Sequence, residues 1–95
     1  KPVEMSYAKH VYHVYAIRTP KRDSMQESLQ AQGIQTGIHY PIPVHLQKAY
    51  ADFGYGLGDL PVTERASNEL LSLPMFAELE DRQIEVVCAA VREAA

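Results

Sequence analysis

One segment rich in glycine and proline constrains the fold of this chain more than any other. It is Gly33–His45, with the sequence GIQTGIHYPIPVH. Ile34 and Ile38 share one face of an extended backbone. Gly37 and His39 share the opposite face. The two prolines that follow fix their own backbone angles, and the residue before each proline is held extended. The run therefore predicts a short strand that leads into a stiff turn.

Three polar ring side chains lie in this turn or directly after it. His39 and Tyr40 end the predicted strand, and His45 begins the segment that follows. Stiff backbone at a strand end can present site residues, but the same side chains also suit a packed, hydrogen-bonded turn. His45 has the same two roles open, in a site or in holding the loop. If the strand stays regular, Tyr40 lies on the face opposite His39.

The hydrophobic pattern predicts strands and helices in alternation. Strands are expected at 10–17, 34–39 and 71–74. Helices are expected at 20–32, at 44–53, from Pro61 onward and at 81–93, with a flexible loop at 54–59. Met25 and Leu29 mark the inner face of the first helix, and Gly33 fits its C-terminal end. Two or three strands with helices between them indicate an α+β fold.

Length and composition limit the classes of function. Ninety-five residues make a single domain, 1–95. A net charge of -3 without a basic patch argues against a nucleic-acid partner, and no apolar run approaches the ~20 residues of a membrane span. Cys88 is the only cysteine, which indicates a reducing compartment and a cytoplasmic location. Cys88 belongs to an apolar helical stripe with Ile84, Val87 and Val91, so it is expected in the core.

Other motifs favour structural roles. His10 and His13 would lie on opposite faces of a strand, so no metal site is expected. The glycines of 54–58 lack the spacing of a phosphate-binding loop, which indicates a connector. Arg18 and Arg22 leave two roles open, a clamp for a carboxylate or phosphate and a solvated surface charge.

Several motifs follow one another in a familiar order. They are HVYHVYAIR at 10–18, Arg22-Asp23, GIHYPIPVHLQKAY at 37–50, GDLPVTE at 58–64 and LSLPMF at 71–76. Together they resemble the C-terminal part of the nucleotide-sugar aminotransferases of the DegT/DnrJ/EryC1/StrS family, from about Lys9 to the end of the chain. The resemblance implies a C-terminal small domain of an aspartate-aminotransferase-type fold. Its small sheet would have two to four mainly antiparallel strands, with helices packed on one side.

The resemblance also implies a function. Family members use pyridoxal phosphate (PLP) to move an amino group, usually from glutamate, onto a keto carbon of a nucleotide-linked sugar, and they are homodimers. By this resemblance His39, Tyr40 and His45 would bind the substrate. Members are several times longer than this chain, and none of its lysines matches the context of the family's cofactor lysine: Lys1, Lys9, Lys21 and Lys48. The 95-residue chain alone is therefore expected to lack the catalytic PLP domain, to bind no PLP and to be inactive.

An alternative of another class stays open. The chain is then a stand-alone binding or dimerisation module without catalysis, and an exposed apolar face is its partner surface.

Overall fold

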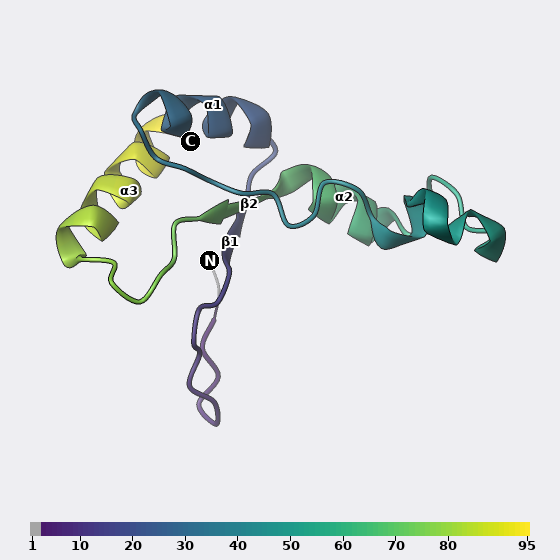
Figure 1. Ribbon diagram of the computed structural model, residues 1–95, viewed down its shortest axis with the longest axis horizontal. Coiled ribbons are helices and arrows are strands. Elements are labelled where there is room, and N and C mark those ends of the chain that lie inside the picture. Colours follow the sequence, from purple (N-terminus) through teal and green to yellow (C-terminus); the bar gives the residue numbers. More distant parts are fainter. Residues whose placement is uncertain (1–2) are drawn as a thin grey trace.

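The structure is a computed structural model and describes residues 3–95. Figure 1 shows helices beside a small sheet and an extension that leads away from it. The elements in chain order are β1 Tyr15–Arg18, α1 Arg22–Ala31, the 3-10 helices η1 Val44–Leu46 and η2 Lys48–Phe53, α2 Pro61–Glu69, β2 Leu70–Leu73 and α3 Asp81–Ala94. No helix within residues 3–95 is long and apolar enough to cross a membrane.

The sheet consists of β1 and β2, paired antiparallel from Tyr15↔Leu73 to Arg18↔Leu70. Gly37 pairs with Ser72 on the other edge of β2, as an isolated antiparallel bridge. Its N–H donates to the carbonyl of Ser72 at 3.0 Å, and the Ser72 N–H donates back at 2.7 Å. The expected α+β class and antiparallel sheet are confirmed.

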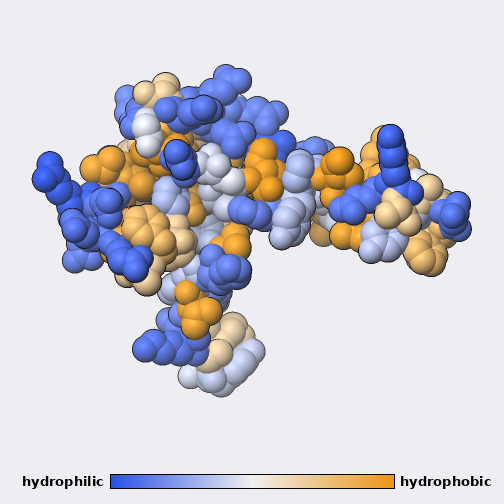
Figure 2. All heavy atoms as spheres, viewed as in Figure 1, coloured by the Kyte–Doolittle hydropathy of each residue, from blue (hydrophilic) through white to orange (hydrophobic). Residues whose placement is uncertain are grey.

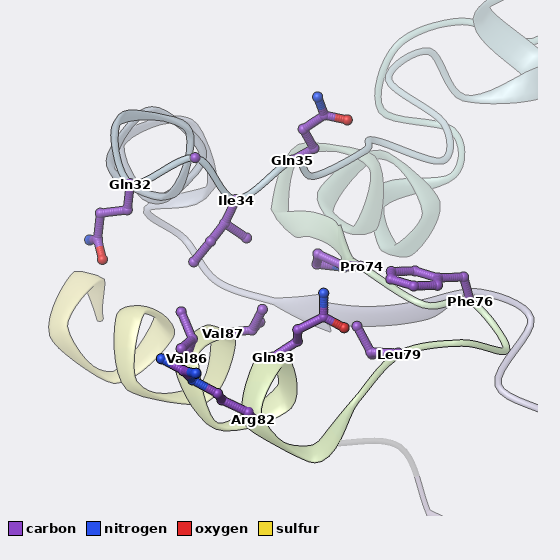
Figure 3. Close-up of a pocket in the computed structure, with 11 residues that line it drawn as sticks. Gln32, Ile34, Gln35, Pro74, Phe76, Leu79, Arg82, Gln83, Val86 and Val87 are labelled. Carbon is purple, nitrogen blue, oxygen red and sulfur yellow. The ribbon is translucent and has the colours of Figure 1, made fainter.

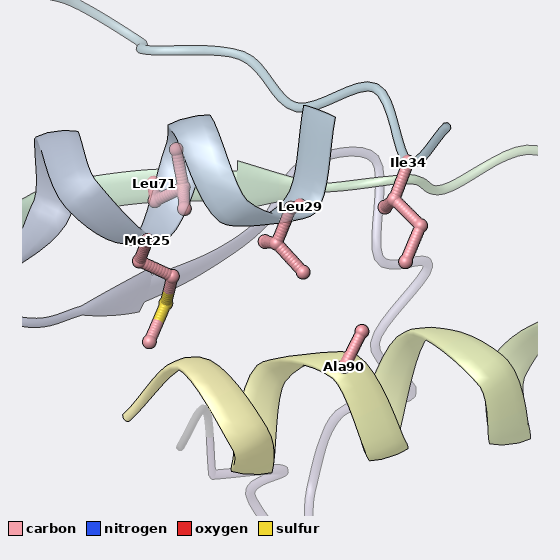
Figure 4. Packing of buried hydrophobic residues seen from close by; sticks show 5 residues of the cluster. All are labelled: Met25, Leu29, Ile34, Leu71 and Ala90. Atoms are coloured by element: carbon pink, nitrogen blue, oxygen red, sulfur yellow. The ribbon is translucent and has the colours of Figure 1, made fainter. Parts of the chain in front are cut away.

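The core lies between α1, β2 and α3 (Figure 4). Leu29 and Leu71 are fully buried, and Met25, Ile34 and Ala90 complete the cluster. Met25 and Leu29 are the buried residues of α1, as their four-residue spacing predicts. Gly33, with φ of 77°, follows the end of α1, as the sequence predicts, because a left-handed backbone there suits glycine.

The two arginines near α1 have structural partners. The Arg22 side chain is only 11% exposed, pairs with Asp23, and donates to the Ser67 carbonyl at 3.2 Å. Arg18 pairs with Glu69 at 2.6 Å. These contacts join the start of α1 and the end of β1 to the junction of α2 and β2.

Two strand predictions are wrong in extent. Residues 10–14 are irregular: Tyr12 has a positive φ of 49°, and its N–H donates to His10 Nδ1 at 2.7 Å. The segment 34–39 makes one bridge at Gly37 rather than a strand. Both predicted strands are too long for the same reason. A strand needs a neighbouring strand to pair with, and β2 is only four residues long.

The helix predictions hold at 61–69 and 81–94, whereas 44–53 forms two 3-10 helices instead of one helix. The stripe on α3 is correct in part. Val87 and Val91 pack against the core, but Ile84 is 42% exposed and Cys88 is exposed. The expectation of a core role for Cys88 is therefore wrong, because Cys88 is exposed and lines an apolar groove together with Tyr15 and Leu79.

Candidate functional site

The His39 side chain is exposed, and a hydrogen bond at Nδ1 holds its ring in place. Its Nδ1 lies 2.9 Å from Ser72 Oγ, and Ser72 is only 6% exposed. The ring also lies against Gly37, where a Cβ atom would come within 2.7 Å of His39 Cε1. The prediction that Gly37 and His39 share a face is thereby confirmed. The result is an imidazole presented at the sheet edge with its position set by two residues.

Tyr40 lies beside His39, not on the opposite face. The two rings meet edge to face with centroids 5.5 Å apart, and Tyr40 is 71% exposed. The opposite-face expectation is wrong because regular pairing ends at Gly37, so strand alternation no longer applies. The pair offers two adjacent polar rings, and both can form hydrogen bonds to a ligand.

His45 is buried, and it is not part of the exposed pair. Its Nε2 lies 3.0 Å from Glu64 Oε1, with the two side chains 5% and 14% exposed. The Glu64 carboxylate also accepts the N–H of Gly58 at 2.9 Å and of Leu60 at 3.2 Å. This network joins η1, the loop before α2 and α2 itself.

The charge state of Glu64 follows from these contacts. Desolvation raises the pKa of this carboxyl, but the hydrogen bonds from His45, Gly58 and Leu60 outweigh it and hold the pKa below its ordinary value of 4.5. A carboxylate only accepts hydrogen bonds, so His45 Nε2 carries a proton and donates it. His45 Nδ1 is buried without a partner in residues 3–95.

Sequence reasoning missed Ser72 and Glu64, which hold the two histidines. Ser72 is the one polar residue of an otherwise apolar strand, LLSL, and that is a signal for a buried polar contact. Glu64 carries no such signal, because an acidic residue in the first turn of a helix is ordinary.

The main cavities within residues 3–95 are not lined by His39 or Tyr40. Figure 3 shows a cavity of about 560 Å³ between α3 and the chain that follows α1. His39, Tyr40 and His45 are absent from its lining. A second cavity, of about 370 Å³, includes His45 among apolar and aromatic neighbours on η1, η2 and α2. His39 and Tyr40 therefore lie on an exposed surface and line neither of these two cavities.

PLP enzymes hold their cofactor as a Schiff base on a lysine. Within residues 3–95, Lys9, Lys21 and Lys48 are exposed, and Lys21 Nζ donates to the Ala95 carbonyl at 2.9 Å. Residues 3–95 also hold no group of three metal-ligating side chains.

The fold is that of aminotransferases. DesV from S. venezuelae, in complex with a ketimine intermediate, matches with a TM-score of 0.86 and 39% identity over 98% of this chain and 25% of that chain. The aminotransferase TlmJ from Streptoalloteichus hindustanus matches with a TM-score of 0.82 and 35% identity over 98% of this chain and 24% of that chain.

Comparison of sequences gives the family. Residues 1–92 match the DegT/DnrJ/EryC1/StrS aminotransferase family, and the chain belongs to it. It is 48% identical to a pleiotropic regulatory protein of Geobacillus stearothermophilus over 97% of this chain and 25% of that protein. It is 43% identical to a dTDP-3-amino-3,4,6-trideoxy-alpha-D-glucose transaminase of Streptomyces venezuelae over 97% of this chain and 24% of that protein. The chain thus spans about a quarter of the length of these relatives.

Proposed function

We propose that this chain is the C-terminal small domain of a PLP-dependent aminotransferase that transfers an amino group from glutamate to a keto-sugar nucleotide. The family match over residues 1–92 carries the proposal. The parent protein is a cytoplasmic homodimer, and its remaining part holds the cofactor and the lysine. Relatives named as transaminases of dTDP-linked and UDP-linked sugars support this substrate class.

In this proposal His39 and Tyr40 contact the substrate. Both rings are exposed and adjacent, and the His39 ring is anchored by the buried Ser72, which is a geometry that can orient a ligand. PLP, when bound in the parent protein, supplies the electron sink for amino transfer. The residues of this chain position the sugar or the donor carboxylate beside it.

His45 has an indirect role in the proposal. It is buried and bonded to Glu64, so it holds the loop 54–60 instead of reaching an open surface. The chain contributes substrate contacts through His39 and Tyr40 and loop geometry through His45.

The test uses the full-length protein with a keto-sugar nucleotide and glutamate. His39→Ala is expected to lower kcat/KM for the sugar nucleotide about three- to hundred-fold, the range from a neutral to a charged hydrogen-bond acceptor. His10→Ala, the same change on the irregular N-terminal segment, is the control and leaves kcat/KM unchanged. Equal effects of the two variants would remove His39 from the substrate site.

An uncovered apolar groove supports the alternative of a binding or dimerisation module. It has a volume of about 410 Å³ and an almost wholly apolar lining that includes Tyr15, Leu79 and Cys88. Light scattering on the 95-residue chain separates the two proposals. A monodisperse dimer favours the module, whereas aggregation favours a domain that needs the rest of its parent protein.

A further inference from the structure

We propose that Ser72 is a positioning residue that fixes the tautomer of His39, so that Nε2 carries the proton and donates it to an oxygen acceptor of the substrate. The contact with substrate rests on the function proposed above. The tautomer does not, because it follows from contacts within this chain.

Ser72 is held firmly enough to impose an orientation. It lies in β2, is 6% exposed, and both its backbone N–H and its carbonyl are bonded to Gly37. Its hydroxyl lies 2.9 Å from His39 Nδ1 and has no second hydrogen-bond partner within residues 3–95.

This isolation of the hydroxyl decides which group donates. A neutral imidazole has one N–H donor and one bare nitrogen acceptor. If Nδ1 carried the proton, Ser72 would accept it and its own hydroxyl hydrogen would be buried without a partner, which is unfavourable. If Ser72 donates to Nδ1, both groups are satisfied. The proton of the ring then resides on Nε2.

Gly37 completes the arrangement by leaving room for the ring. A Cβ at this position would lie 2.7 Å from His39 Cε1, closer than two carbons can approach without a shift. His39 is exposed, and no side chain or backbone group of the described part of the chain bonds to its Nε2. Nε2–H is therefore available to a hydroxyl, phosphate or carboxylate oxygen.

Nitrogen-15 NMR of histidine side chains in the full-length protein tests the tautomer. The His39 signals are assigned by their loss in His39→Asn. The wild-type spectrum is expected to show the Nε2–H form, and a predominant Nδ1–H form would overturn the proposal without any variant at Ser72.

Variants at two serines test the role of the hydroxyl. Ser72→Ala is expected to reduce the Nε2–H preference, and Ser72→Thr, which restores a hydroxyl, to recover it. Ser67→Ala is the matched control, because Ser67 is similarly buried at 8% exposure and belongs to α2. An unchanged His39 spectrum in Ser72→Ala would contradict the proposal.

Kinetics of the same protein test the donor. His39→Gln places an amide N–H₂ near the position of Nε2, whereas His39→Asn places it near Nδ1. His39→Gln is expected to keep a kcat/KM about three- to ten-fold above that of His39→Asn, the value of one neutral hydrogen bond. Equal values would overturn the contact with substrate and leave the tautomer result standing. Absence of aminotransfer by the wild-type protein would reject the proposed function instead.

Discussion

At the scale of single residues, the two histidines of the proline-rich turn have opposite environments. His39 is exposed and bonded to a serine, and His45 is buried and bonded to a carboxylate. The first arrangement leaves a polar atom free for a ligand, and the second uses the ring to hold a loop. The residue type is the same in both cases, so it is the hydrogen-bond partner of each histidine that determines its role.

The contact between Gly37 and His39 gives the first prediction. Gly37→Ala is expected to push the exposed His39 ring off Ser72 and to cost about 1–3 kcal/mol of stability, because the buried Ser72 hydroxyl then loses its hydrogen-bond partner. Gly33→Ala is the control: open space surrounds Gly33, but its φ of 77° makes alanine cost about 1 kcal/mol. Urea unfolding and the His39 NMR signal measure the two effects. A loss of stability in Gly37→Ala with an unmoved His39 signal would refute this reading.

The lowered pKa of Glu64 gives a prediction for pH. Because its pKa in the folded chain lies below the ordinary 4.5, the stabilisation is complete above that value and is lost as the pH falls through the folded pKa. Glu64→Gln is expected to flatten the fall in stability as the pH drops below about 4.5. Urea midpoints across this range measure the slope. Glu85→Gln, an exposed carboxylate on α3, keeps the wild-type slope, and a wild-type slope in Glu64→Gln would contradict the network.

At the scale of elements, a small core joins α1, β2 and α3. Among residues 3–95 its buried cluster has five side chains, of which only Leu71 belongs to a strand, and each strand is only four residues long. Such a core depends strongly on each member, because few other contacts compensate. Arg22 adds polar contacts to it by binding carbonyls at the end of α2 and the start of β2.

The core predicts a large effect of truncation on α1. Leu29→Ala is expected to cost about 2–5 kcal/mol, because it removes a fully buried side chain. Leu57→Ala is the matched control and is expected to change stability by less than about 0.5 kcal/mol, since Leu57 is 82% exposed. Thermal unfolding measures both. Similar melting points for the two variants would argue against this core.

At the scale of the whole molecule, the chain leaves much apolar surface uncovered. Figure 1 shows η1, η2 and the following loop extending away from the sheet, and Figure 2 shows apolar side chains at the surface of this extension and near α3. The extension exposes Phe53, Tyr55 and Leu57 to 71%, 56% and 82%. A surface of this kind favours contact with further polypeptide, as expected for a chain that spans about a quarter of its relatives.

The exposed Cys88 gives a test of that contact. In the 95-residue chain Cys88 is expected to react readily with a thiol reagent, because it is exposed and lines the apolar groove. In the full-length protein we expect the groove to be covered and labelling to be slower, which mass spectrometry of the Cys88 peptide measures. Cys88→Ser identifies the labelled peptide. Equal rates in both proteins would mean that the rest of the parent protein does not cover this face.

The sequence by itself determined what depends on near neighbours. The four-residue spacing of Met25 and Leu29, the glycine that ends α1 and the extent of α3 were readable because helices form from contacts within a few residues. The shared face of Gly37 and His39 was also readable, because residues two apart in extended backbone lie on the same face. The order of the motifs also indicated the family.

Tertiary structure alone decided which partners the site residues have. Ser72 lies 33 residues from His39 and Glu64 lies 19 residues from His45, and no local pattern encodes such pairs. The predicted strands were too long, and Cys88 was wrongly assigned to the core, because a strand needs a partner and an apolar helix face needs a cover. The partner of a strand and the cover of a helix face both depend on how segments distant in the sequence meet in space.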